Sequence, residues 1–138
     1  MKKYLLIILS FILAISLLAG CAGKTPTDDG KNIEVKEDIP VKLEYSRYWE
    51  YGAFGESEDP EYIKQVLKCI SALEIGEETN QGADDFTDIL VFTYADGSTV
   101  TYEFEADWIV NEDGTRNMIT GGDLSGLRTL LSEMLDIE

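Results

Sequence analysis

Hydrophobic and polar residues alternate most clearly between residues 88 and 105. Two runs, 89–94 and 98–104, flank Ala95-Asp96-Gly97, an arrangement typical of a β-hairpin. A two-residue turn and a three-residue turn both fit this sequence, and their registers differ by one residue. We favour the three-residue turn with Gly97 in the left-handed conformation, because it gathers these apolar residues on one face: Leu90, Phe92, Val100, Tyr102 and Phe104.

Shorter alternating segments predict further strands. Val41, Leu43 and Tyr45 occupy alternate positions of the segment 39–45, the period of a half-buried strand. Pro40 suits the start or the edge of a strand. Segments 108–110 and 115–119 predict a second hairpin across Asp113-Gly114.

Apolar residues at helical spacing predict two helices. Asp59 is suited to cap a helix that begins at Pro60 and is closed by Gly76. Its apolar stripe comprises Ile63, Val66, Leu67, Ile70 and Leu73. The chain ends in a second helix, capped by Gly122 or Asp123, with these residues inward: Leu124, Leu127, Leu130, Leu131 and Met134. The polar, acidic segment 77–85 between the first helix and the first hairpin predicts a loop.

The order of these elements predicts a single α+β domain over residues 33–138. In it, a small antiparallel sheet has two helices packed on one face. Cys69 falls on the apolar stripe of the first helix. We expect it to be a small buried core residue rather than a reactive thiol, because the chain has no His to serve as its base.

The first twenty residues have the layout of a secretory signal. Lys2 and Lys3 precede an apolar run over residues 4–19. As a helix this run reaches only about 24 Å, short of the roughly 30 Å of membrane hydrocarbon. Leu18-Ala19-Gly20-Cys21 resembles the lipobox of bacterial lipoproteins at all four positions. The resemblance implies that Cys21 receives a diacylglyceryl group and that residues 1–20 are cleaved before it.

Residues 21–32 then comprise the lipidated Cys21 and a small, polar segment that we expect to be a flexible tether. Two acyl chains hold a protein far more firmly than a single chain. The expected location is the outer, extracytoplasmic face of a cell membrane, with the lipid on Cys21 as the membrane contact.

The charge balance narrows the choice of partner. The chain has 27 acidic and 11 basic residues, and Lys2 and Lys3 leave with the signal, so the mature chain has a net charge of −18. Binding to nucleic acids depends on Lys and Arg neutralising phosphates, so we exclude them as partners. Anionic lipid headgroups would also be repelled, so membrane attachment requires the lipid anchor.

The residue types present in the chain limit which catalytic and metal sites it can form. Without His, the chain lacks triads with a His base and zinc sites that contain His. A carboxylate-dependent hydrolase would need two acids facing each other in a cleft. Segments 84–88 and 111–114 offer oxygen ligands for calcium but lack the spacing of an EF-hand, and the second segment is well explained as a turn. We expect no catalytic activity, no cofactor and no bound metal.

Five aromatic residues occur within ten positions: Tyr45, Tyr48, Trp49, Tyr51 and Phe54. Aromatic side chains are enriched where proteins meet partners, but they also fill cores. We take Tyr48, Trp49, Tyr51 and Phe54 as candidate binding residues. The resulting prediction is a non-catalytic binding module, for a protein or peptide. The alternatives are a glycan-binding module that uses the aromatic cluster at 45–54, and a small hydrolase.

Overall fold

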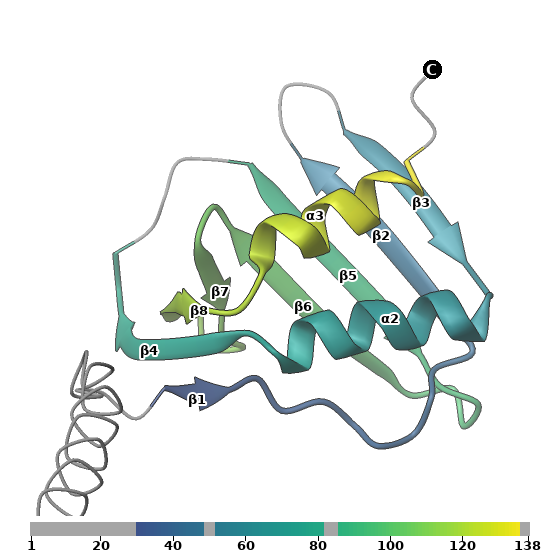
Figure 1. Ribbon diagram of the computed structural model, residues 1–138, viewed down its shortest axis with the longest axis horizontal. Helices are drawn as coiled ribbons and strands as arrows, with labels where there is room; N and C mark the ends of the chain where they lie inside the picture. The colour runs from purple at the N-terminus through teal and green to yellow at the C-terminus, as the bar shows by residue number, and fades with distance from the viewer. Residues whose placement is uncertain (1–29, 49–51, 82–85, 136–138) are drawn as a thin grey trace, which may run out of the picture.

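The computed structural model describes residues 30–48, 52–81 and 86–135, which form one sheet and two helices (Figure 1). The sheet is antiparallel and eight-stranded, in the order β1-β4-β8-β7-β6-β5-β2-β3. Its strands are β1 (Lys31–Asn32), β2 (Lys42–Tyr48), β3 (Ala53–Ser57), β4 (Glu74–Thr79), β5 (Thr87–Thr93), β6 (Thr99–Glu105), β7 (Trp108–Val110) and β8 (Arg116–Gly121). Strands β1 and β3 are therefore the two edges of the described sheet.

The predicted fold, a small antiparallel sheet with two helices packed on one face, is wrong. The eight-stranded sheet dominates the fold, whereas helices α2 (Pro60–Ser71) and α3 (Leu124–Ser132) have only 12 and 9 residues. The prediction missed β1, β3 and β4, and β4 covers both the end of the predicted first helix and the first residues of the predicted loop 77–85. The missed strands are very short or rich in Gly and Glu, residues that strands disfavour, so no apolar alternation marks them.

The central hairpin has the predicted three-residue turn. Tyr94 N donates to Ser98 O at 2.9 Å, and Gly97 has a left-handed φ of 82°. Phe92 pairs with Val100, and Leu90 pairs with Tyr102. This register was favoured because it places the apolar side chains on one face, and it is confirmed.

Local capping explains where the two helices begin. The Asp59 carboxylate accepts a hydrogen bond from Glu61 N at 3.0 Å, and Pro60 occupies the first turn of α2. The Asp123 carboxylate accepts from Gly126 N at 2.7 Å and caps α3. Helix α2 ends at Ser71, earlier than the predicted stop at Gly76, because the chain turns there into β4.

The core lies between the helices and the inward-facing side chains of the central strands (Figure 1). Helix α2 buries Ile63, Val66, Leu67 and Ile70, and α3 buries Leu127 and Leu131. The strands contribute Leu43, Tyr45, Leu90, Phe92, Tyr102, Phe104 and Ile109. Cys69 is a free, half-buried thiol packed against this core rather than inside it. Neither of the described helices is long and apolar enough to cross a membrane.

Candidate binding site at the β3 edge

The aromatic cluster expected from the sequence is divided between the core and the surface. Tyr45 is completely buried, whereas Tyr48 at the end of β2 and Phe54 on β3 are 56% and 52% exposed. Trp49, Tyr51 and the predicted lipidation residue Cys21 lie outside the described residues.

Tyr48 and Phe54 share the face of the sheet that points away from the helices. Phe54 pairs with Ser46, which has the same parity as Tyr48 and the opposite parity to buried Tyr45. The two aromatic residues are therefore diagonal neighbours across β2 and β3, within reach of each other's rings. An exposed aromatic pair of this kind offers apolar area to a partner.

Strand β3 is an open edge. It pairs with β2 from Leu43↔Ser57 to Arg47↔Ala53, and among the described residues no strand pairs with its other side. Every second residue of an edge strand presents its backbone N–H and C=O outward, and these groups can bind another extended chain. At the opposite edge, β1 has only two residues and presents far less backbone.

A groove of about 560 Å³ follows β3 on the helix side of the sheet. The start of α2 and the end of α3 form its other walls. Its lining residues are Phe54, Gly55, Glu56, Ser57, Asp59, Tyr62, Glu133 and Met134. The groove is open at the free edge of β3, so Phe54 and Glu56, which have the parity of the outward face, also line it.

Gly55 allows the end of α3 to lie directly against β3. A Cβ at this position would come within 2.2 Å of Met134 O, closer than two such atoms can approach. Tyr62 of α2 reaches across to α3, where its hydroxyl donates to Leu130 O at 2.6 Å. Burial, together with the nearby Glu133 carboxylate, raises the pKa of Tyr62 to about 12. The wall of the groove is thus a neutral, hydrogen-bonded tyrosine beside an acidic residue.

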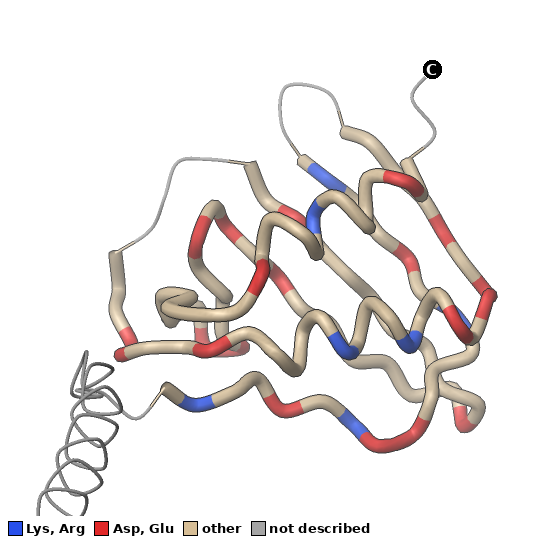
Figure 2. Tube along the Cα trace, viewed as in Figure 1, with Lys and Arg blue, Asp and Glu red and all other residues tan. Residues whose placement is uncertain are grey.

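The rim of the groove is acidic. Figure 2 shows Asp and Glu along β3, at the turn into α2 and at the end of α3. Glu56, Asp59 and Glu133 are all exposed. The nearest described cation on the strands is Lys42, which is already bonded to Glu56 at 2.8 Å and to Glu44 at 3.3 Å. Exposed carboxylates of this kind are suited to recognising positive charge.

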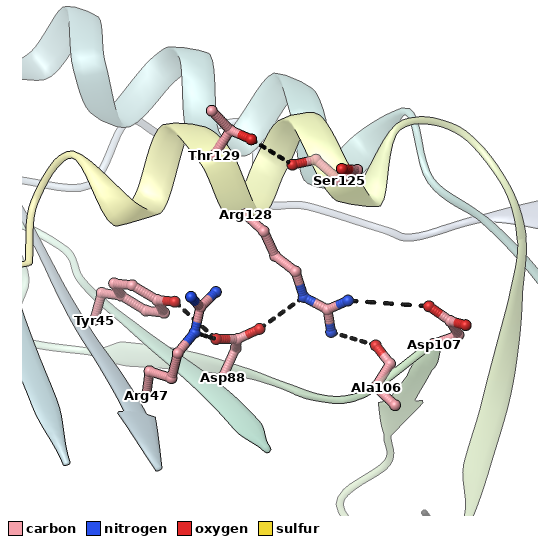
Figure 3. Close-up of polar contacts among 8 residues, drawn as sticks. All are labelled: Tyr45, Arg47, Asp88, Ala106, Asp107, Ser125, Arg128 and Thr129. Atoms are coloured by element: carbon pink, nitrogen blue, oxygen red, sulfur yellow. Dashed lines mark hydrogen bonds and ion pairs between the residues drawn. The ribbon is translucent and has the colours of Figure 1, made fainter. Parts of the chain in front are cut away.

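A buried ionic cluster holds α3 over this end of the sheet (Figure 3). Asp88 of β5 is 1% exposed. Its Oδ1 accepts from Tyr45 Oη and from Arg47 Nε, both at 2.7 Å, and its Oδ2 accepts from Arg128 Nε of α3 at 2.9 Å. Arg128 also donates to Ala106 O, a residue held at a left-handed φ of 45°. One carboxylate thus links two strands to a helix.

The charges of this cluster reinforce one another. Burial disfavours the charge on Arg47, but the Asp88 carboxylate outweighs this effect and raises the pKa of Arg47. Burial and the hydrogen bond to Asp88 raise the pKa of Tyr45 far above its ordinary value. The guanidinium carbons of Arg47 and Arg128 lie 5.3 and 4.7 Å from the centre of the Phe86 ring. Both Asp88 oxygens are engaged and shielded from solvent, so the arrangement fixes the fold rather than offering a reactive carboxyl.

The sequence indicated Asp88 only as part of the segment 84–88 of possible calcium ligands, and it did not indicate Arg47 or Arg128. A usable signal was present, since Asp88 has the same parity as Leu90 and Phe92 and therefore had to point into the core. A carboxylate in such a position requires cationic partners. Those partners come from distant segments, and only the folded chain identifies them.

The other acidic segments have ordinary structural explanations where they are described. The Asp113 carboxylate accepts from Thr115 N at 3.0 Å and from Thr115 Oγ1 at 2.7 Å within the β7–β8 turn. Residues 84 and 85 of the other segment lie outside the described residues. Within the described ranges, no three His, Cys, Asp or Glu side chains gather closely enough to hold a metal ion.

No protein-family model, curated protein or solved structure matches this chain.

Proposed function

We propose that the chain is a lipid-anchored extracytoplasmic protein whose domain is a non-catalytic binding module for a protein or peptide. The observation that carries this proposal is the open edge of β3, with exposed Tyr48 and Phe54 on one side and a groove on the other. Addition of a strand to an exposed sheet edge is an established mode of peptide recognition, in which backbone hydrogen bonds give affinity and flanking pockets give specificity.

The lipobox-like residues at positions 18–21 support the membrane anchor. After cleavage and lipidation at Cys21, the tether would join the domain beside β1, the edge opposite to β3. The anchor would therefore leave the β3 edge accessible.

Glycan binding is the second candidate, and the exposed Tyr48 and Phe54 pair favours it because sugar rings stack on exposed aromatic side chains. A glycan would use these rings and would have no need of the β3 backbone. The two candidate functions therefore differ in whether a polypeptide or a glycan contacts Phe54.

Photo-crosslinking from position 54 tests the proposal directly. Phe54 is replaced by benzoyl-phenylalanine in the full-length, membrane-anchored protein. The matched control places the same group at Met118, which is 45% exposed and lies on the same outward face but five strands away. We expect a discrete crosslinked protein from position 54 and none from position 118. Crosslinks to polysaccharide alone would replace the proposal with glycan binding, and equal crosslinking from both positions would contradict it.

Substitution of the same residue gives the energetic test. Phe54→Ser should weaken capture of the crosslinked partner by about 2 kcal/mol, as loss of a central aromatic contact does. Met118→Ser should leave capture unchanged. Both side chains are exposed, so the thermal unfolding midpoint of each variant should remain close to that of the parent protein.

A further inference from the structure

The β3 edge specifies an extended backbone as its ligand. Its five residues run antiparallel to β2, and the strand bends little enough to keep five consecutive pairs in register. An added chain would continue this ladder, and its side chains would alternate between the two faces of the sheet. Consecutive ligand residues would therefore meet two different environments.

On the helix side, the environment is acidic. Glu133 at the end of α3 and Asp59 at the start of α2 line the groove, whereas Glu56 has the parity of Phe54 and points to the outward face. Helix α3 has no basic residue in its last turn to offset Glu133. Lysine and arginine side chains from an added strand would reach these carboxylates along the groove.

On the outward side, the environment is apolar and aromatic. Phe54 and Tyr48 are exposed there, whereas the charged residues Lys42, Glu44 and Glu56 at the other end of the hairpin already form ion pairs with one another. Apolar side chains at alternate ligand positions would cover the two rings.

Building on the function proposed above, we propose that the partner is an extended polypeptide segment in which basic and apolar residues alternate, bound as an additional strand along β3. Its basic side chains lie over Asp59 and Glu133, and its apolar side chains lie against Phe54 and Tyr48. The net charge of −18 on the mature chain draws such a segment towards the domain and repels acidic competitors.

The probe for this proposal is a short fluorescent peptide of alternating lysine and valine, titrated into the full-length protein in uncharged detergent micelles. We expect binding that weakens with salt, whereas alternating serine–valine and glutamate–valine peptides bind at least about tenfold more weakly. A peptide of the same composition with its lysines in one block should also bind weakly. If the peptide with its lysines in one block binds as tightly as the alternating peptide, the binding is general charge attraction and the proposal is overturned.

Backbone methylation separates strand addition from charge attraction. Two versions of the lysine–valine peptide carry N-methyl groups on alternate residues, one on the lysines and one on the valines. Only one version removes the N–H groups that face β3, so one should lose more than about tenfold in affinity and the other should bind normally. If both versions bind as well as the parent peptide, no strand is added.

Variants of the protein locate the site. Glu133→Gln should weaken binding of the lysine–valine peptide by about three- to fivefold. The control, Glu112→Gln, removes an equally exposed acid in the β7–β8 turn and should have no effect. If the serine–valine peptide binds β3 as tightly as the basic one, the charge selectivity is wrong but peptide binding stands. If no peptide binds and position 54 crosslinks no protein, both proposals fail.

Discussion

Asp88 shows how one residue can decide the structure around a site that it does not line. Among the described residues it is the only charged side chain that is buried, and it forms ion pairs with two guanidinium groups. Removing one partner from a buried ionic group leaves an uncompensated charge, which is strongly destabilising. The position of α3, and with it the Glu133 wall of the groove, therefore depends on this carboxylate.

Tyr45 gives this cluster a measurable pH dependence. Its ordinary pKa is 10.0, and in the fold it is raised because burial and Asp88 favour the neutral hydroxyl. Above pH 10 the unfolded chain loses this proton while the folded chain retains it. The stabilising contribution is thus complete below pH 10 and declines as the pH rises towards the folded-state value.

Tyr45→Phe tests both the hydrogen bond to Asp88 and the pH dependence of stability. At neutral pH the variant should lose about 1.5–3 kcal/mol of unfolding free energy, the value of a hydrogen bond to a charged group. Above pH 10 its stability should decline less steeply than that of the parent protein. Denaturant unfolding curves at neutral and alkaline pH measure both effects, and parallel declines would show that Tyr45 does not titrate differently on folding.

At the scale of elements, the sequence predicts the helices and strands that bury one face and whose apolar residues recur at a regular spacing. The β5–β6 register follows from the parity of Leu90 and Phe92 and from the turn at Gly97, both of which are local. Strand β4 could not be found in this way. Its Glu74–Thr79 sequence is mostly polar and includes Gly76, and it is a strand because it pairs with β8 more than thirty residues later. Edge strand β3 pairs with its neighbour β2, but its Ala53–Ser57 sequence has no apolar alternation to reveal it, so the sequence indicates only Phe54 and Tyr48 of the site.

The packing of the end of α3 on β3 can be tested by substituting Gly55. Gly55→Ala would force a methyl group onto Met134 O, so we expect a loss of about 1–3 kcal/mol and displacement of the end of α3. Gly52→Ala is the matched control, since nothing lies within 4 Å of its Cβ position. Denaturant unfolding should distinguish the two variants, and equal stabilities would mean that α3 does not pack on β3 as described.

At the scale of the whole molecule, the acidic surface opposes contact with an anionic membrane, and the proposed lipid would provide the attachment. A mature chain with a net charge of −18 would not remain on an anionic membrane by itself. Attachment should therefore depend on Cys21 alone, whereas folding should depend on the domain alone.

Cys21→Ser tests whether membrane attachment and folding depend on different parts of the chain. The variant should lose lipid labelling and leave the membrane fraction, because no other part of the chain is expected to hold it there. Its binding of the lysine–valine peptide should be unchanged. The control is Cys69→Ser, which changes a half-buried thiol and should leave lipid labelling intact. A mature chain that begins at a residue other than Cys21 would contradict the prediction.

If the proposed lipid tether joins the domain beside β1, the strand order limits the distance from the membrane at which a partner could be held. Strands β1 and β3 are separated by seven inter-strand steps, which correspond to roughly 34 Å across the sheet. With a lipid tether joined beside β1, the sheet becomes a spacer that holds its open edge above the headgroups. A partner strand would extend this spacer outward instead of inserting between protein and membrane. Capture would then require no bending of the bilayer and no rearrangement of the anchor, and several such proteins could stand side by side with their open edges exposed.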